Sequence, residues 1–182
     1  TLRMALFQLE PFMFADKATG EGRGAVVDYW RDYLAPRMGC GVEVVGLFPI
    51  TRVEKMLESG EIDLAPLFTR IPDRESRFVY PSTGYFEVTA CLMVLPDSPI
   101  REVERQEDLF GERFGFVEGA FLPPLMRHKS IGIELVSNVD YRSINLRKLF
   151  AGRIDGCLDI NYDSLRFFLK EQGCADKVRL VM

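Results

Sequence analysis

The pattern of apolar and polar residues predicts alternating helices and strands along most of the chain. Apolar residues recur at helical spacing in 51–59, and the apolar stretch 62–68 that follows is typical of a strand. The same succession returns in 143–151 and 154–158. Strands that alternate with helices favour a mainly parallel sheet covered by helices.

The same reading extends to the rest of the chain. The expected strands are 2–9, 41–47, 62–68, 88–95, 113–117, 133–136, 154–158 and 178–181. The expected helices are 25–38, 51–59, 143–151 and 163–172, with a short helical turn at 107–111 and a helical turn region at 118–128. The long apolar strand 88–95 is expected to join two α/β series.

One short motif occurs twice. The stretch Leu57-Glu-Ser-Gly60-Glu-Ile62-Asp63 returns as Leu149-Phe-Ala-Gly152-Arg-Ile154-Asp155, an offset of 149 − 57 = 92 residues. In each copy a glycine ends a helical pattern, where a left-handed conformation is least costly, and a strand pattern follows. The repeat predicts two similar α/β lobes, and a cleft between two lobes is a place where small molecules bind.

Composition and charge narrow the class of protein. The 182 residues are 47% hydrophobic and 27% charged, as in an ordinary globular protein of one large or two small domains. The net charge is −4 with no basic tract, so a nucleic-acid partner is not expected. No apolar run approaches the ~20 residues of a membrane helix. Four widely spaced cysteines without Cys-x-x-Cys give no support to a zinc site. They do not indicate whether the protein resides in an oxidising or a reducing compartment.

Catalytic motifs are absent from the sequence. The single histidine, His128, lies in a polar stretch and is interpreted as a surface residue. There is no Gly-x-Ser-x-Gly, no Walker loop and no His-Glu-x-x-His, and the glycines of 20–24 have a spacing that fits a loop better than a phosphate site. We therefore expect no enzyme, no catalytic residue, no metal and no cofactor.

A binding function has more support. The segment Thr69-Arg-Ile-Pro-Asp73-Arg74 follows the predicted strand 62–68, and ligands bind beyond the carboxyl ends of strands in open α/β sheets. The planar fork of an arginine suits a carboxylate. The alternative is a helix start, with Thr69 or Asp73 as N-cap and the arginines solvated. The pattern alone leaves both open.

Aromatic residues in predicted loops are a second indication. They can form an apolar wall for a ligand or take part in ordinary packing. The residues concerned are Phe12, Phe14, Phe48, Tyr85 and Phe86.

These motifs, in their order along almost the whole chain, give the sequence a resemblance to a known family. The matching stretches are 10–12, 24–29, 57–63, 69–74, 81–86, 107–115, 118–119 and 149–155. Together they resemble the bacterial extracellular solute-binding proteins of family 3, the periplasmic amino-acid-binding components of ABC importers. The likeness is divergent, and the chain looks shortened at its C-terminus.

The resemblance implies an α/β fold, a two-lobe periplasmic-binding-protein clamshell of type II in which each lobe is a mainly parallel sheet flanked by helices. Lobe 1 is expected at 1–87, without the family's usual C-terminal return segment. The hinge strand is expected at 88–96, lobe 2 at 97–179 and the start of a second hinge crossing at 180–182.

The function that the resemblance implies is binding of a small carboxylate-bearing solute, an amino acid or related organic acid, in the inter-lobe cleft. The partner is expected to be an ABC permease of the inner membrane, and the protein a monomer that is periplasmic or lipid-anchored outside the cell. The alternative is a ligand-sensing module of a signalling protein or a regulatory domain of a cell-wall enzyme.

Site residues follow from the same resemblance. Arg74 matches the arginine that binds a ligand carboxylate, and Thr69 matches the hydroxyl five residues before it. In the first lobe the other expected ligand-binding residues are Leu9, Glu10, Phe12, Ile50 and Leu67; in the second they are Gly119, Ala120, Phe121, Asp159 and Asn161.

Three of the family's usual anchors are altered. Ile50 stands where many members have a tryptophan, and Ala120 and Phe121 stand where they have serine or threonine. The acidic residue that receives a ligand ammonium is replaced by Ile160, between Asp159 and Asn161. These changes favour a larger, less polar carboxylate over a free α-amino acid.

Overall fold

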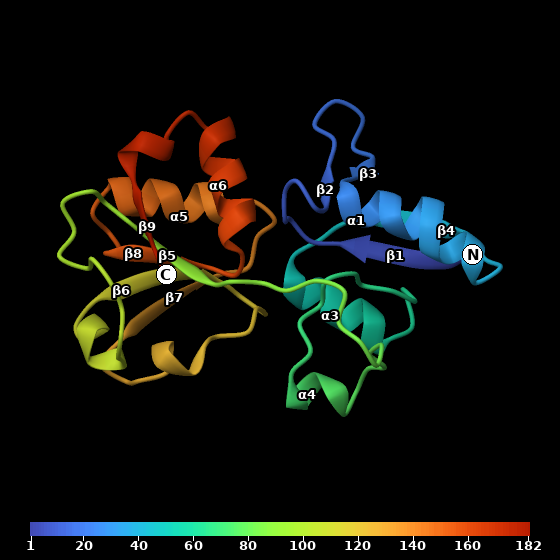
Figure 1. Ribbon diagram of the computed structural model, residues 1–182, viewed down its shortest axis with the longest axis horizontal. Coiled ribbons are helices and arrows are strands. Elements are labelled where there is room, and N and C mark those ends of the chain that lie inside the picture. The colour runs from blue at the N-terminus through green and yellow to red at the C-terminus, as the bar shows by residue number, and fades with distance from the viewer. The chain divides into compact units, whose positions relative to one another are not determined.

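The computed structural model describes all residues, 1–182, and the chain forms two compact units, Thr1–Glu87 and Val88–Met182 (Figure 1). Each unit combines strands and helices, as the alternating pattern predicts. The lobe boundaries and the hinge role expected for 88–96 stay predictions.

Unit 1 is built on a small parallel sheet. Strand β1 (Leu2–Leu6) pairs in parallel with β4 (Val42–Leu47), and a parallel bridge joins Met4 to Leu64. Strands β2 (Phe14–Ala15) and β3 (Gly22–Arg23) form a short antiparallel hairpin. The helices are α1 (Ala25–Asp28), the π-helix η1 (Tyr29–Leu34), α2 (Ala35–Arg37), α3 (Ile50–Glu58) and α4 (Pro72–Glu75).

The apolar stripe of α3 faces the sheet. Val53 and Met56 are buried with Ala5 of β1 and with Ile62 in one hydrophobic cluster. The helix predicted at 51–59 is therefore confirmed, one residue out at each end. The helix predicted at 25–38 is also confirmed, with a π-helical centre.

The strand predicted at 62–68 is wrong except at Leu64. Only Leu64 makes a β-bridge, and the chain turns immediately after it. Pro66 has no N–H to donate to a sheet, and Leu67 adopts a positive φ of 56° that no strand contains. The apolar character of this stretch reflects a packed turn instead.

Unit 2 contains a five-stranded mixed sheet in the order β7-β6-β8-β5-β9. Strand β6 is parallel to β7 and β8, whereas β5 is antiparallel to β8 and β9. The strands are β5 (Cys91–Val94), β6 (Arg113–Val117), β7 (Gly132–Val136), β8 (Gly156–Asp159) and β9 (Arg179–Val181). The helices are α5 (Tyr141–Phe150) and α6 (Tyr162–Glu171), with 3-10 turns η2 (Gln106–Leu109), η3 (Pro124–Met126) and η4 (Ala175–Lys177).

One face of this sheet is covered by α5 and α6, which lie together in Figure 1. Leu149 and Leu165 from the two helices pack on Met93 and Cys157 of neighbouring strands. The helical region expected at 118–128 is reduced to the turn η3. Pro123 and Pro124 explain this difference, since proline disfavours helical geometry in the residue before it.

The sequence repeat corresponds to a repeated structure. In unit 1, the Asp63 carboxylate accepts the backbone N–H of Arg3 (2.8 Å) at the start of β1, and the Asp63 N–H donates to the Arg3 carbonyl (2.9 Å). In unit 2, Asp155 makes the same pair of bonds with Arg113 at the start of β6, both at 2.8 Å. The aspartate of the motif thus ties the end of a helix-to-strand corner to the start of a neighbouring strand, β1 in unit 1 and β6 in unit 2.

None of the helices combines the length and the apolar character that crossing a bilayer requires.

Candidate functional site

The first group of candidate residues lies at one edge of the unit 1 sheet. Because β1, β4 and the bridge at Leu64 run in parallel, their carboxyl ends share an edge. Every candidate predicted in this unit follows one of these carboxyl ends: Leu9, Glu10, Phe12, Ile50, Leu67, Thr69 and Arg74. Leu9 and Ile50 are buried there.

Arg74 is the most constrained of these candidates. It is buried on α4, and its guanidinium carbon lies 3.7 Å from the centre of the Phe68 ring. Its Nη2 donates to Glu54 on α3 (3.0 Å), and its Nη1 donates to the Thr69 carbonyl (3.4 Å). The alternative reading, a helix start with solvated arginines, is wrong for Arg74.

A helix does start here, at Pro72, but not with the expected N-cap. The N-cap of α4 is Ile71, with no side-chain cap, so neither Thr69 nor Asp73 has this role. Thr69 contributes its backbone carbonyl instead, which accepts from Arg74 and from the Tyr80 hydroxyl (3.1 Å).

Leu67 has an unusual backbone conformation. Its φ of 56° is rare for a bulky residue, because the Cβ atom makes this conformation unfavourable. Residues with such backbone strain cluster at active sites and ligand-binding sites. The Leu67 N–H points to the hydroxyl of Tyr85 (3.5 Å), which also accepts from the Trp30 indole (3.3 Å). Phe12 packs edge-on against Phe86 with ring centres 4.8 Å apart. Loop aromatics therefore gather around this edge.

The second group lies at the carboxyl edge of the unit 2 sheet. Gly119, Ala120 and Phe121 follow β6, and Asp159 ends β8, the strand beside it. The chain leaves β6 toward β7 on one side and then crosses back to β8 on the other. Such a reversal creates the crevice in which open α/β sheets bind ligands.

Asp159 is engaged inside the unit. Its two carboxylate oxygens accept from Nε and Nη2 of Arg142, both at 2.8 Å, and the Asn161 N–H donates to the same carboxylate (3.0 Å). Arg142 also donates to the Ser164 hydroxyl (2.8 Å). The side chains of Arg142 and Asp159 are 3% and 4% exposed, so the pair is buried.

Arg142 was not among the predicted site residues, although the sequence contains a signal for it. Arg142, Asn145, Leu146 and Leu149 have the spacing i, i+3, i+4, i+7, and all four are buried. A charged residue on a buried helical stripe requires a buried partner. The helix expected from residue 143 excluded Arg142, whereas α5 begins two residues earlier.

The other unit 2 candidates have local roles in the structure. Asn161 is the N-cap of α6, and its side chain accepts from the Ser164 N–H (2.8 Å). The Phe121 ring lies under the Arg127 guanidinium, 5.1 Å from its carbon. Gly119 has a φ of 86°, which a residue with a Cβ rarely adopts.

The buried carboxylate also affects a neighbouring thiol. Cys91 lies directly opposite Asp159 across the β5–β8 pair. Burial, and then the negative charge of Asp159, raise the pKa of the Cys91 thiol to about 12. This cysteine is protonated and unreactive at neutral pH.

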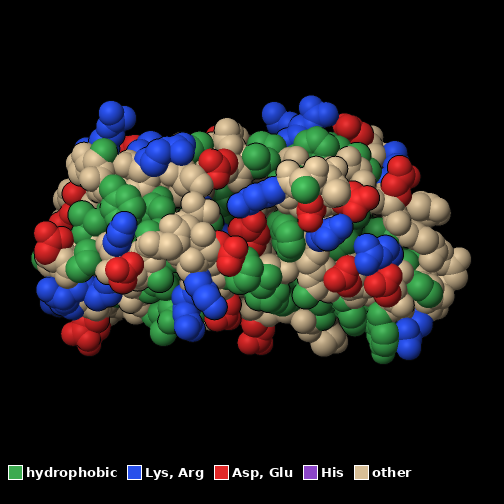
Figure 2. Space-filling model, turned by 90° about the horizontal axis from the view of Figure 1, so that it is seen from above, with side chains coloured by type: hydrophobic (Ala, Val, Ile, Leu, Met, Phe, Trp, Pro, Cys, Tyr) green, Lys and Arg blue, Asp and Glu red, His purple; other side chains and the backbone are tan.

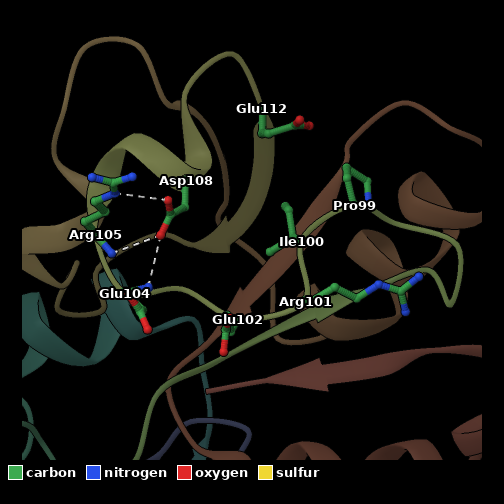
Figure 3. A pocket seen from close by; sticks show the side chains of 8 residues that line it. All are labelled: Pro99, Ile100, Arg101, Glu102, Glu104, Arg105, Asp108 and Glu112. Atoms are coloured by element: carbon green, nitrogen blue, oxygen red, sulfur yellow. Dashed lines mark hydrogen bonds and ion pairs between the residues drawn. The ribbon is translucent and has the colours of Figure 1, made fainter.

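Two pockets within unit 2 are separate from the candidate residues. The larger, about 490 Å³, is lined by charged residues of the segment 99–112, among them Glu102, Glu104 and Glu112 (Figure 3). Asp108 in this pocket accepts from the backbone N–H groups of Glu104 and Arg105 (both 3.1 Å). The second, about 180 Å³, is mainly apolar and lies between β5 and η3. Neither contains a predicted site residue.

The face shown in Figure 2 has no continuous patch of basic side chains. Lys and Arg side chains are interspersed there with Asp and Glu. No group of three or more His, Cys, Asp and Glu side chains is arranged to hold a metal ion.

Comparison with solved structures identifies the fold. The arginine-bound Gly52Ala mutant of ArgBP from T. maritima superimposes with a TM-score of 0.79 at 20% identity, over 100% of this chain and 81% of that one. An ancestral arginine-binding protein bound to glutamine gives 0.77 at 24% identity, over 99% and 77%. The chain has the type II periplasmic-binding-protein fold. The solute receptor for L-cysteine of Neisseria gonorrhoeae shares this fold, with a TM-score of 0.76 at 20% identity over 95% and 69%.

The fold class predicted from the sequence is thereby confirmed, and these neighbours are binding proteins for amino acids. A scan against protein-family models found no match, and a search of curated proteins found no significant one.

Proposed function

We propose that this protein binds a small carboxylate-bearing solute, an amino acid or a related organic acid, and delivers it to an ABC importer. The observation that carries the proposal is the fold, which the whole chain shares with proteins bound to arginine or glutamine. Another neighbour is described as the substrate-binding protein of an amino-acid ABC transporter. Every α-amino acid has a carboxylate, so a carboxylate anchor is the first requirement of such a site.

Arg74 is the proposed anchor in unit 1. The stacking on Phe68 and the bond to the Thr69 carbonyl hold its guanidinium in one orientation. A guanidinium held in this way has lost its conformational freedom before the ligand arrives, which favours binding. Around it, Leu9, Glu10, Phe12, Ile50 and Leu67 are the proposed contacts with the rest of the solute.

Unit 2 is proposed to contribute through the loop 119–121 and the segment 159–161. This loop carries no charged side chain at Gly119, Ala120 or Phe121. Asp159 is already paired with Arg142, which makes it a poor acceptor for a ligand ammonium. This supports an organic acid, or an amino acid whose ammonium group is bound elsewhere.

The test is the identity of the solute that accompanies the protein. Mass spectrometry of material released by denaturing freshly purified protein is expected to detect one small carboxylate. The Arg74→Ala variant is expected to lose it, and Arg74→Lys, which keeps the charge but not the fork, to retain only part of it. The exposed Arg70→Ala variant is the matched control and is expected to retain it fully.

Thermal denaturation provides a second readout. A ligand at one hundred times its Kd stabilises the folded state by about 2.7 kcal/mol. If the protein is purified empty and shows no thermal response to amino acids, dicarboxylates or short peptides, the proposal is wrong. A bound carboxylate that survives Arg74→Ala in a folded variant would remove Arg74 as the anchor.

A further inference from the structure

We infer that Glu54 is an internal competitor, whose carboxylate occupies Arg74 and must be displaced by the carboxylate of the solute. The inference rests on the proposed function, because it assumes that Arg74 is the anchor. It adds a residue on α3 that sets how strongly the site holds an anion.

The geometry of Glu54 is the first argument. One of its oxygens accepts from Nη2 of Arg74 at 3.0 Å, and the other accepts from Nη2 of Arg77. The side chains of Glu54 and Arg74 are 18% and 4% exposed, so their attraction is only weakly screened by water. The Glu54 carboxylate therefore makes with Arg74 the same kind of charge-assisted hydrogen bond that a ligand carboxylate would make.

The surroundings of Arg77 are the second argument. Arg77 also forms ion pairs with Glu58 and Asp73, in addition to Glu54. Glu54 can therefore release Arg74 and keep a cationic partner in Arg77. This gives the carboxylate two positions of comparable chemistry, one that covers Arg74 and one that leaves it to a ligand.

The consequence for binding follows from linkage. A ligand that needs the uncovered form of Arg74 binds with an apparent affinity reduced by the fraction of molecules in that form. Weak or poorly oriented anions cannot displace Glu54, whereas a solute with further contacts at the edge can. The competitor thus lowers affinity for carboxylates in general and raises discrimination among them.

Acetate is a suitable probe, since it supplies a carboxylate without other recognition groups. Its binding is measured by NMR titration of the Nε–H resonance of Arg74, which is assigned by its loss in Arg74→Lys. Glu54→Gln keeps the size of the side chain and removes its charge, so acetate is expected to bind roughly tenfold more tightly than to the wild type. Glu61→Gln, whose carboxylate pairs with the exposed Arg52, is the matched control and is expected to leave acetate binding unchanged.

A gain of affinity is a result that structural damage does not produce. Equal or weaker acetate binding in a folded Glu54→Gln protein, or no response of Arg74 in either protein, overturns the inference. Glu54→Ala provides a second test with the same expected direction. The proposed function is tested separately by the solute retained in Arg74→Ala, so a failure of one can be told from a failure of the other.

Discussion

At the scale of single residues, the charges at the two carboxyl edges are paired inside their own units. Arg142 and Asp159 form the most deeply buried of the ion pairs, and both carboxylate oxygens are used. A buried charge without its partner is costly, because it has lost its water and gained nothing in return.

This predicts the effect of Arg142→Ala. The variant leaves Asp159 buried without its cation, and we expect a loss of about 3–5 kcal/mol in the free energy of unfolding. Urea denaturation of the variant and the wild type measures it. The exposed Arg147→Ala variant on the same helix is the control, with an expected change within about 0.5 kcal/mol. A small effect at Arg142 would show that the pair contributes little to the fold.

At the scale of elements, the repeated corner is the clearest link between sequence and structure. Asp63 and Asp155 occupy the same place in the two copies of the motif. Each accepts the backbone N–H of an arginine near the start of a strand, Arg3 in β1 or Arg113 in β6. In unit 1 the Arg3 side chain, followed by its backbone N–H, lowers the pKa of Asp63 to about 2.

The pH dependence of stability follows from this shift. The folded pKa of Asp63 lies below the ordinary value of about 3.9, so its contribution is complete above pH 4 and is lost as the pH falls toward 2. We expect Asp63→Asn to be less stable than the wild type at pH 6 and to approach it near pH 2. Unfolding in urea across this range is the measurement. Asp97→Asn, at an exposed position, is the control and should show no such convergence.

At the scale of the whole molecule, burial divides the four cysteines into two classes. Cys91, Cys157 and Cys174 are buried and Cys40 is partly exposed, all as free thiols. Burial raises the pKa of all three buried thiols, that of Cys91 to about 12.

We therefore expect one thiol to react promptly with a thiol reagent at pH 8 in the native protein, and four after unfolding in urea. Cys40→Ser should remove the prompt reaction and leave the slow ones. Prompt labelling of Cys91 would mean that the unit 2 sheet opens readily beside Asp159.

Much of the fold could be predicted from local patterns. Strand β6 at 113–117 was predicted residue for residue, because its apolar run is short and bounded by polar residues. The predicted strand 62–68 failed because an apolar run does not distinguish a strand from a packed turn, and nothing in the local pattern signals the positive φ of Leu67.

The candidate site, too, could be predicted from the sequence only in part. The sequence by itself determined the alternation of helices and strands, the repeated corner and the order in which the candidate residues follow the strands, since these depend on periodicity and on neighbours along the chain. The type II fold was implied by the resemblance to a family. Only the tertiary structure decided which charges meet. The partner of Arg74 is 20 positions away at Glu54, and that of Arg142 is 17 positions away at Asp159. Ion pairing depends on distance in space, and side chains that are remote in sequence come within hydrogen-bonding distance only when the chain packs into its tertiary structure.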